Sequence, residues 1–302
     1  MVLQEVKFFT QLPLDVRKCS QVVTKILYLH SLGETFSNAE NTQIFFSATR
    51  LFQSQDPVLR RLVYLAIKCL NTKQDEVLAV TASLCQDING KVDSFRANAI
   101  RVLAQVVDAP MLSQVERFFK QAIVDKNAFT SSSALIAGIH LFKLGPDVIR
   151  RWVNEVQEAV SGARSKMSQY HALHLLYLIK RHDRLAISKV VTSLARAPPK
   201  SALAQCLLIR YMGAALQDDP AAANGGSGSG DRTLLDFMTQ ALRNKNSAVV
   251  YEAARQLCRI RNVSAAVVAP AVAALQEFLS HAVPTQVCAL LLGDDSGLVL
   301  ME

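Results

Sequence analysis

The sequence predicts an all-α protein, a solenoid in which antiparallel helix pairs stack on one another. One observation is a helix-turn-helix pattern at residues 56–86. A second is the return of similar units along the chain, the first of them 36 residues later, between Arg60 and Arg96. A third is that no stretch alternates strictly between polar and apolar residues, as a half-buried strand would.

Residues 56–86 show the unit in its clearest form. Asp56 can cap the first helix by accepting a backbone N–H bond, and Pro57 suits the first helical position. Apolar residues then recur at the spacing of a one-faced helix, the polar stretch Asn71–Gln74 interrupts them, and the pattern restarts at Val77. Such a pair cannot bury its apolar face alone, so we expect it to stack on further pairs.

Further units follow in order. Aligned on Arg60, the equivalent positions are Arg96, Ser132, Tyr170, Gln205 and Tyr251. Each unit has a polar turn followed by small and branched apolar residues at helical spacing. Six units in succession predict an α-solenoid of the HEAT or armadillo type, with almost no strand.

The expected helices follow from apolar periodicity and from stop signals. Gly33, the dipeptide Ala109-Pro110 and the dipeptide Gly145-Pro146 are read as interruptions. The expected helices cover residues 14–32, 38–53, two within 56–86, 93–108, 111–124, 131–144, 147–160, 168–181, 184–197, 201–216, 231–243, 247–260 and 264–280.

One long domain accounts for nearly the whole chain. We expect a trunk over residues 1–288, with a flexible loop at 217–230 (QDDPAAANGGSGSG) because Gly-Ser composition favours random coil. Residues 289–302 are expected to be an atypical C-terminal tail. The loop is interpreted as an insertion within a repeat and not as a domain boundary.

Composition limits the functional classes. Lys and Arg number 33 against 25 Asp and Glu, and the basic residues are scattered in pairs such as Arg60-Arg61, which we interpret as solvated outer faces. The six cysteines form no CxxC pair and are expected to be small core residues of a reducing compartment. No apolar run is long enough for a membrane helix, and we expect a cytosolic protein with no nucleic-acid partner.

No motif predicts catalysis. The glycine-serine run at 226–230 lacks the spacing of a phosphate-binding loop, and flexible linker is the favoured interpretation. His171 and His174 could share a helix face, but no further ligand has matching spacing, so packing is favoured over metal binding. We therefore expect no enzyme activity, no catalytic residues, no cofactor and no metal.

Several stretches closely resemble the adaptin-like trunk of coatomer gamma subunits, over roughly residues 2–282. The first, LFQSQDPVLRRLVYLAIK, is shared in part with clathrin-adaptor subunits, whereas FKQAIVDK and RRWVNEVQEA are specific to coatomer gamma. The matching segments are Lys18–Leu29, Leu51–Lys68, Phe119–Lys126, Ser131–Leu141, Arg150–Ala159, Gln169–Lys189 and Asn244–Ala254.

The resemblance implies a structural subunit of the COPI coat, which acts in Golgi-to-ER and intra-Golgi vesicle transport. Implied partners are an Arf-family small GTPase in its GTP form, the coatomer zeta subunit and other coatomer subunits. The implied location is the cytoplasm and, through partners, the surface of Golgi membranes and COPI vesicles. By resemblance, the GTPase-contacting positions are Leu78 and Thr81, with Lys73 and Lys91 nearby for steering, although burial of Leu78 in the core is the competing interpretation.

Two alternatives remain beside this one: another HEAT-type adaptor, such as a nuclear transport receptor or phosphatase scaffold, and an enzyme with an unrecognised site. Members of the resembled family are much longer than this chain, and the last fifteen residues do not resemble the expected repeat helix. The chain is therefore expected to be a truncated or alternatively spliced form.

Overall fold

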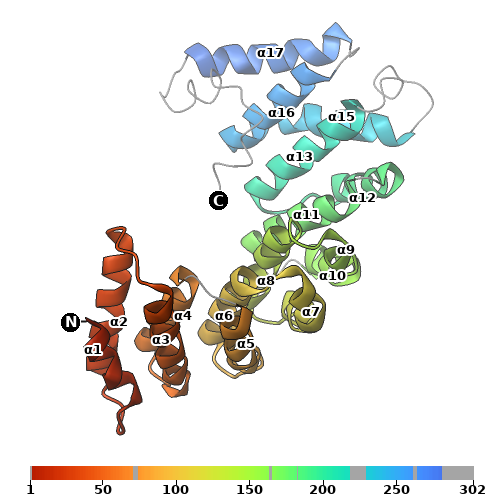
Figure 1. Ribbon diagram of the computed structural model, residues 1–302. Coiled ribbons are helices and arrows are strands. Elements are labelled where there is room, and N and C mark those ends of the chain that lie inside the picture. Colours follow the sequence, from red (N-terminus) through yellow and green to blue (C-terminus); the bar gives the residue numbers. More distant parts are fainter. Residues whose placement is uncertain are drawn as a thin grey trace. The chain divides into compact units, whose positions relative to one another are not determined.

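The computed structural model confirms the all-α fold (Figure 1). It describes residues 2–70, 74–162, 165–181, 183–217, 229–260 and 264–280, and these ranges contain helices and turns but no strand. The chain divides into two compact units, residues 1–179 and 180–302, which are described separately.

The first unit is a succession of short helices. They are α1 (Val2–Glu5), the 3-10 turn η1 (Val6–Thr10), α2 (Val16–Ser31), α3 (Asn38–Thr49), the 3-10 turn η2 (Arg50–Gln53), α4 (Pro57–Cys69), α5 (Gln74–Ile88), α6 (Asp93–Val106), α7 (Ala109–Ile123), α8 (Ala128–Leu141), α9 (Pro146–Arg150), α10 (Val153–Gly162) and α11 (Lys166–Lys180).

Alternate helices of this unit form two rows, as a solenoid requires. In one row α4 packs on α2 and α6, α6 packs on α8, and hydrogen bonds join α8 to α11. In the other row α5 packs on α3 and α7, and α7 packs on α10. Each helix pair thus buries its apolar faces against its own partner and against its neighbours in the stack.

The second unit holds α12 (Arg184–Arg196), α13 (Ala202–Gln217), α15 (Ser229–Ala241), α16 (Ser247–Arg259) and α17 (Ala265–Ser280). Here α12 packs on α13 and α15, while α16 packs on both α13 and α17. None of the helices within the described ranges of either unit is long and apolar enough to cross a membrane.

Side-chain caps fix where many helices begin. Asp56 accepts bonds from the backbone N–H groups of Val58 and Leu59, at 3.0 and 2.8 Å, as its position before Pro57 predicts. Equivalent caps are made by Asp15, Asp108, Asn127 and Asn246, and Ser37 with Glu40 forms a complete capping box.

The expected single helix at 147–160 is wrong. The chain forms α9 and α10 with a turn at Arg151 and Trp152 between them. The Trp152 side chain is fully buried and its ring stacks on Phe119 of α7, with 5.6 Å between the ring centroids. The tryptophan packs into the core at the point where the helix breaks, and local periodicity carries no signal for that contact.

Other boundaries differ from expectation. Ala109-Pro110 does not separate two helices but opens α7, because Asp108 caps that helix and proline is tolerated in a first turn. The helical segments at residues 2–10 were not predicted. Gln217 ends α13 and Ser229 begins α15, and the rest of the expected loop, residues 218–228, lies outside the described residues, as does the expected tail at 289–302.

Candidate functional site

Helix α5 presents opposite faces to the core and to solvent. Val77, Val80 and Leu84 are buried, as the apolar spacing predicts. Leu78 is 58% exposed, so the interpretation that it belongs to the core is wrong. A large apolar side chain is therefore available on the outer face of the row formed by α3, α5 and α7.

Thr81 contributes less to that face than Leu78. Its side chain is half-buried, and its hydroxyl donates to the carbonyl oxygen of Val77 at 2.7 Å. The hydroxyl is satisfied within its own helix, so the part of Thr81 left for a partner is mainly its methyl group.

The exposed stripe continues along α5 through Ala82 and Gln86, one turn apart. Arg117 of the neighbouring helix α7 lies close to Cys85, because its charge opposes the rise that burial causes in the pKa of the Cys85 thiol. The exposed residue one turn from Leu78 is the small apolar Ala82, and Arg117 lies near the C-terminal half of α5.

The steering lysines expected beside Leu78 are not both there. Lys91 is exposed and lies three residues beyond the end of α5, and the ten helical residues from Leu78 to Ile88 correspond to a rise of about 15 Å. Lys73 lies outside the described residues. Lys91 therefore lies beyond the C-terminal end of α5 and not beside Leu78, and its expected steering role stays a prediction.

A buried ion pair holds the C-terminal end of α5 on α4. The Arg60 guanidinium pairs with Asp87 and also donates to the carbonyl oxygen of Phe52. Arg60 is 1% exposed, so its interpretation as part of a solvated face is wrong, whereas Arg61 beside it is exposed. Aromatic rings enclose the cation: its guanidinium carbon lies 4.8 Å from the Phe52 centroid, 5.2 Å from that of Tyr64 and 4.7 Å from that of Phe95.

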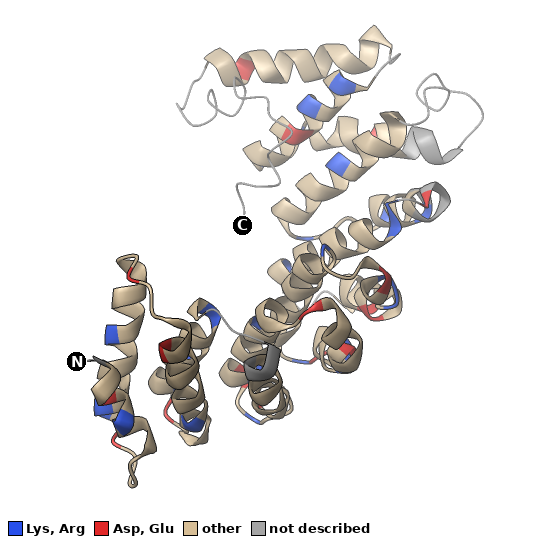
Figure 2. Cartoon of the chain, in the orientation of Figure 1, with Lys and Arg blue, Asp and Glu red and all other residues tan. Residues whose placement is uncertain are grey.

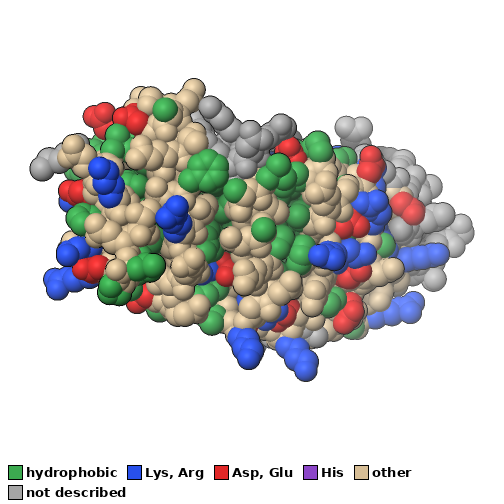
Figure 3. Space-filling view, turned by 60° about the horizontal axis from the view of Figure 1, so that its bottom comes forward, with side chains coloured by type: hydrophobic (Ala, Val, Ile, Leu, Met, Phe, Trp, Pro, Cys, Tyr) green, Lys and Arg blue, Asp and Glu red, His purple; other side chains and the backbone are tan. Residues whose placement is uncertain are grey.

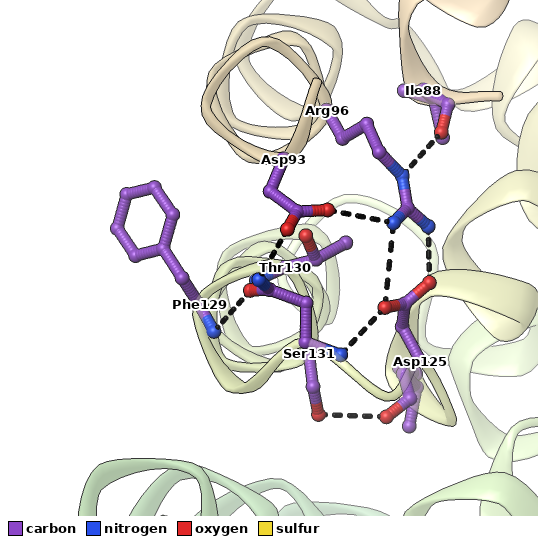
Figure 4. A network of polar contacts seen from close by, with 9 residues as sticks. Ile88, Asp93, Arg96, Asp125, Phe129, Thr130 and Ser131 are labelled. Atoms are coloured by element: carbon purple, nitrogen blue, oxygen red, sulfur yellow. Dashed lines mark hydrogen bonds and ion pairs between the residues drawn. The ribbon is translucent and has the colours of Figure 1, made fainter. Parts of the chain in front are cut away.

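The next unit repeats this arrangement, as Figure 4 shows. Arg96 of α6 pairs with Asp125, which follows α7, and donates to the carbonyl oxygen of Ile88 at 3.1 Å. Asp93 accepts from Asn127 at 2.7 Å and pairs with Arg96 at 3.2 Å. The signal was present in the sequence, because each arginine is followed by an aspartate 27 or 29 residues later.

The third aligned unit replaces the ion pair with a neutral contact. The Ser132 hydroxyl lies 2.9 Å from Nδ1 of His171, and both side chains are buried. His171 thus has a packing role, with one ring nitrogen already engaged. The part of the chain that the structure describes holds no group of three His, Cys, Asp or Glu side chains that could bind a metal ion.

The cysteines are mostly in or near the core. Cys19 and Cys206 are buried, and Cys69 and Cys85 are half-buried. Cys258 is exposed, so the expectation of a core position is wrong for that residue. These five are free thiols, and Cys288 lies outside the described residues.

The stacked pairs and their repeated Arg–Asp contacts define the class: a helical-repeat solenoid whose outer helix faces are available to other proteins. Residues 1–292 match the model of the adaptin N terminal region. The chain belongs to this family.

Within this family the chain is similar to coatomer gamma subunits. The chain is 50% identical to coatomer subunit gamma-2 of Oryza sativa subsp. japonica and to coatomer subunit gamma of Arabidopsis thaliana, in each case over 283 residues. It is 47% identical to coatomer subunit gamma-1 of Bos taurus over 279 residues. These matches cover 94%, 94% and 92% of this chain but 31% of each relative, so the chain spans about a third of their length.

Solved structures support the fold. A chain in a homology model of the full-length AP-3 complex aligns with a TM-score of 0.59 at 12% identity, covering 92% of this chain and 50% of that one. A mutant of Kap121p aligns with a TM-score of 0.61 at 14% identity, covering 92% of this chain and 31% of that one. At such identities these likenesses show the solenoid fold alone.

Proposed function

We propose that this chain serves as a subunit of the COPI vesicle coat and that its α5 surface binds an Arf-family GTPase in the GTP form. The coat assignment rests on the similarity to coatomer gamma subunits across 94% of the chain. The proposed partners include the coatomer zeta subunit and other coatomer subunits. The proposed location is the cytoplasmic surface of Golgi membranes and coated vesicles, reached through partners, and the proposed role is structural and without catalysis.

The observation that carries the GTPase site is the exposure of Leu78. A leucine that packs in the core would be unable to contact a partner, whereas Leu78 is 58% exposed although Val77 and Val80 on the same helix are buried. The GTP form of a small GTPase orders its switch loops, and an apolar contact with ordered loops discriminates between nucleotide states. An apolar anchor near the centre of such an interface contributes roughly 2 kcal/mol or more, equivalent to about 30-fold in affinity.

The experiment is a binding measurement on Leu78→Asp with GTP-locked and GDP-locked Arf. We expect the wild-type chain to bind only the GTP-locked form and the variant to lose roughly 30-fold in affinity, because the new carboxylate would be desolvated at the interface. Thr81→Asp tests the second position, where we expect a smaller loss of affinity and a larger change in melting temperature because Thr81 is half-buried.

Leu279→Asp is a matched control, since Leu279 of α17 is also an exposed helical leucine, at 52%. It should leave Arf binding unchanged. Equal binding by wild type and Leu78→Asp, with both proteins folded, would place the GTPase site elsewhere. Failure of the wild type to bind either form of Arf would contradict the proposed partner.

A further inference from the structure

Carboxylates are nearly missing from one row of helices in the first unit. Helices α2, α4, α6, α8 and α11 contain a single Asp or Glu, which is Asp93. That carboxylate is already bound by Arg96 and Asn127. The opposite row carries acidic residues on α3, α5, α7 and α10, and Figure 2 shows the distribution of charges along the ribbon.

Arg101 of α6 differs from the two arginines of this row that pair with aspartates. Its guanidinium carbon lies 4.7 Å from the ring centroid of Phe129, so the two side chains join α6 to α8. Within the described residues Arg101 makes no ion pair, whereas Arg60 and Arg96 are each paired with an aspartate. Burial with no carboxylate beside it lowers the pKa of the Arg101 guanidinium. This partly buried charge is therefore incompletely compensated in the isolated chain.

Helix α8, which Arg101 contacts through Phe129, carries further apolar and neutral polar side chains. Phe129 is 45% exposed and Ile136, two turns along α8, is 40% exposed. Ser132 lies on α8 between them and contacts His171 of α11 at 2.9 Å. Figure 3 shows one face of the molecule, on which hydrophobic side chains lie among scattered basic and acidic ones. The surface thus combines an unpaired guanidinium with exposed apolar side chains.

We propose that the exposed face of α6, α8 and α11 is a docking surface for an acidic, extended peptide segment of a partner protein. Arg101, oriented by its contact with Phe129, binds a carboxylate of the peptide, and the exposed edges of Phe129 and Ile136 contact an apolar side chain. Axes of packed helices lie about 8–10 Å apart and an extended chain advances about 3.3 Å per residue, so about five or six residues reach from the axis of α6 to that of α11.

The chemistry favours a peptide over the other anionic occupants. A guanidinium presents a planar set of donors that matches a carboxylate in bidentate geometry. The exposed Phe129 and Ile136 would contribute nothing to a free phosphate, whereas a peptide with alternating acidic and apolar residues engages both. This surface lies on the row opposite Leu78, so it is independent of the proposed GTPase site.

The test uses fluorescein-labelled peptides of about eight residues, slightly longer than the span above, in which Glu alternates with Leu or Ile. Fluorescence anisotropy with the full chain measures the dissociation constant. We expect Arg101→Gln to weaken binding by roughly tenfold or more, because a hydrogen-bonded charge pair is lost. Arg101→Lys should retain part of the affinity, and Ile136→Glu should abolish binding by repelling the acidic peptide.

Arg117→Gln is the matched control. Arg117 also lies 4.7 Å over a phenylalanine ring, that of Phe118, but it is on α7 in the opposite row. Its substitution should leave peptide binding unchanged. A peptide with Gln in place of Glu should bind weakly, and raised salt should reduce binding of the acidic peptide.

Three results would overturn the proposal. The first is that the wild-type chain does not bind the acidic peptides, and the second is that Arg117→Gln weakens peptide binding as much as Arg101→Gln does. The third is that the chain binds phosphatidylserine vesicles through Arg101 but does not bind the peptides. If the Arg101→Gln variant does not fold, the peptide affinity of Ile136→Glu is the test, because that substitution alters an exposed position. In that case unchanged peptide binding by folded Ile136→Glu overturns the proposal.

Discussion

Arg60 of α4 and Asp87 of α5 form an ion pair across a helix pair, and Tyr64 completes it by donating to the same carboxylate oxygen at 2.8 Å. Their positions are 27 residues apart. The side chains of Arg60 and Asp87 are 2% and 16% exposed. Because aromatic rings enclose the cation, removal of the carboxylate leaves a buried guanidinium without its charged partner.

Asp87→Ala should therefore lower the free energy of unfolding by about 3 kcal/mol, since it leaves a buried guanidinium unpaired. Urea unfolding followed by circular dichroism measures the change. Asp147→Ala is the control, because Asp147 pairs with Arg150 at the surface, where the Asp147 side chain is 89% exposed. We expect its effect to stay within about 0.5 kcal/mol, and equal losses in the two variants would contradict the importance of burial.

Gly138 of α8 is expected to tolerate no side chain. A Cβ there would lie 2.7 Å from Cδ2 of Leu175 and 3.2 Å from Cζ3 of Trp152. Gly138→Ala should destabilise the protein by about 1–3 kcal/mol, because the Leu175 side chain and the Trp152 ring, both fully buried, would have to shift.

Gly162→Ala provides the comparison for that substitution. No atom lies within 4 Å of a Cβ built at Gly162, and this glycine ends α10. We expect a neutral or slightly stabilising effect, of up to about 1 kcal/mol, through reduced freedom of the unfolded chain. Thermal melting of both variants measures the difference, and a lower melting temperature for Gly162→Ala alone would be the contrary result.

His171 should make stability depend on pH. Burial, reinforced by the nearby charges of His174 and Arg101, lowers the pKa of His171 from 6.5 to about 4. The unfolded chain therefore takes up this proton at a higher pH than the folded chain does. The free energy of unfolding is fully retained above about pH 6.5 and decreases as pH falls from there to about 4, by about 3 kcal/mol.

His171→Gln should reduce that slope while its amide keeps a hydrogen bond with Ser132. His140→Gln is the control, because His140 is on the exposed face of α8. Chemical unfolding at several pH values between 7.5 and 4.5 follows the window set by the two pKa values. A slope unchanged by His171→Gln would show that other groups cause the dependence.

The Gly-Ser-rich stretch at 217–230 leads to a prediction from composition. Limited proteolysis should cut within this stretch before it cuts any helix pair, because polar segments without bulky residues are favoured sites for proteases. Mass spectrometry of the first fragments locates the cut. Earlier cleavage within α4 or α6 would contradict the interpretation of this stretch as a flexible insertion.

The repeated helix pairs could be predicted from the sequence because apolar spacing and capping are local properties. Asp56, Pro57 and the buried face of α5 all behave as their spacing predicts. The break at Trp152 and the early start of α7 were missed, because a buried ring and a side-chain cap outweighed local periodicity there. At the candidate site the helix and the inward residues were predicted, but the exposure of Leu78 and the remoteness of Lys91 required the structure.

The sequence by itself determined the helical class, the repeat and the family resemblance, since each depends on patterns among residues close together in the chain. The tertiary structure decided which charges are buried and which are free. Arg60 and Arg61 are adjacent in the sequence, yet one is enclosed with Asp87 and the other faces solvent. The physical reason is that the free-energy cost of burying a charge depends on the partner that a different helix places beside it. The stacking of helices brings Asp87 to Arg60 but leaves Arg101 without a carboxylate.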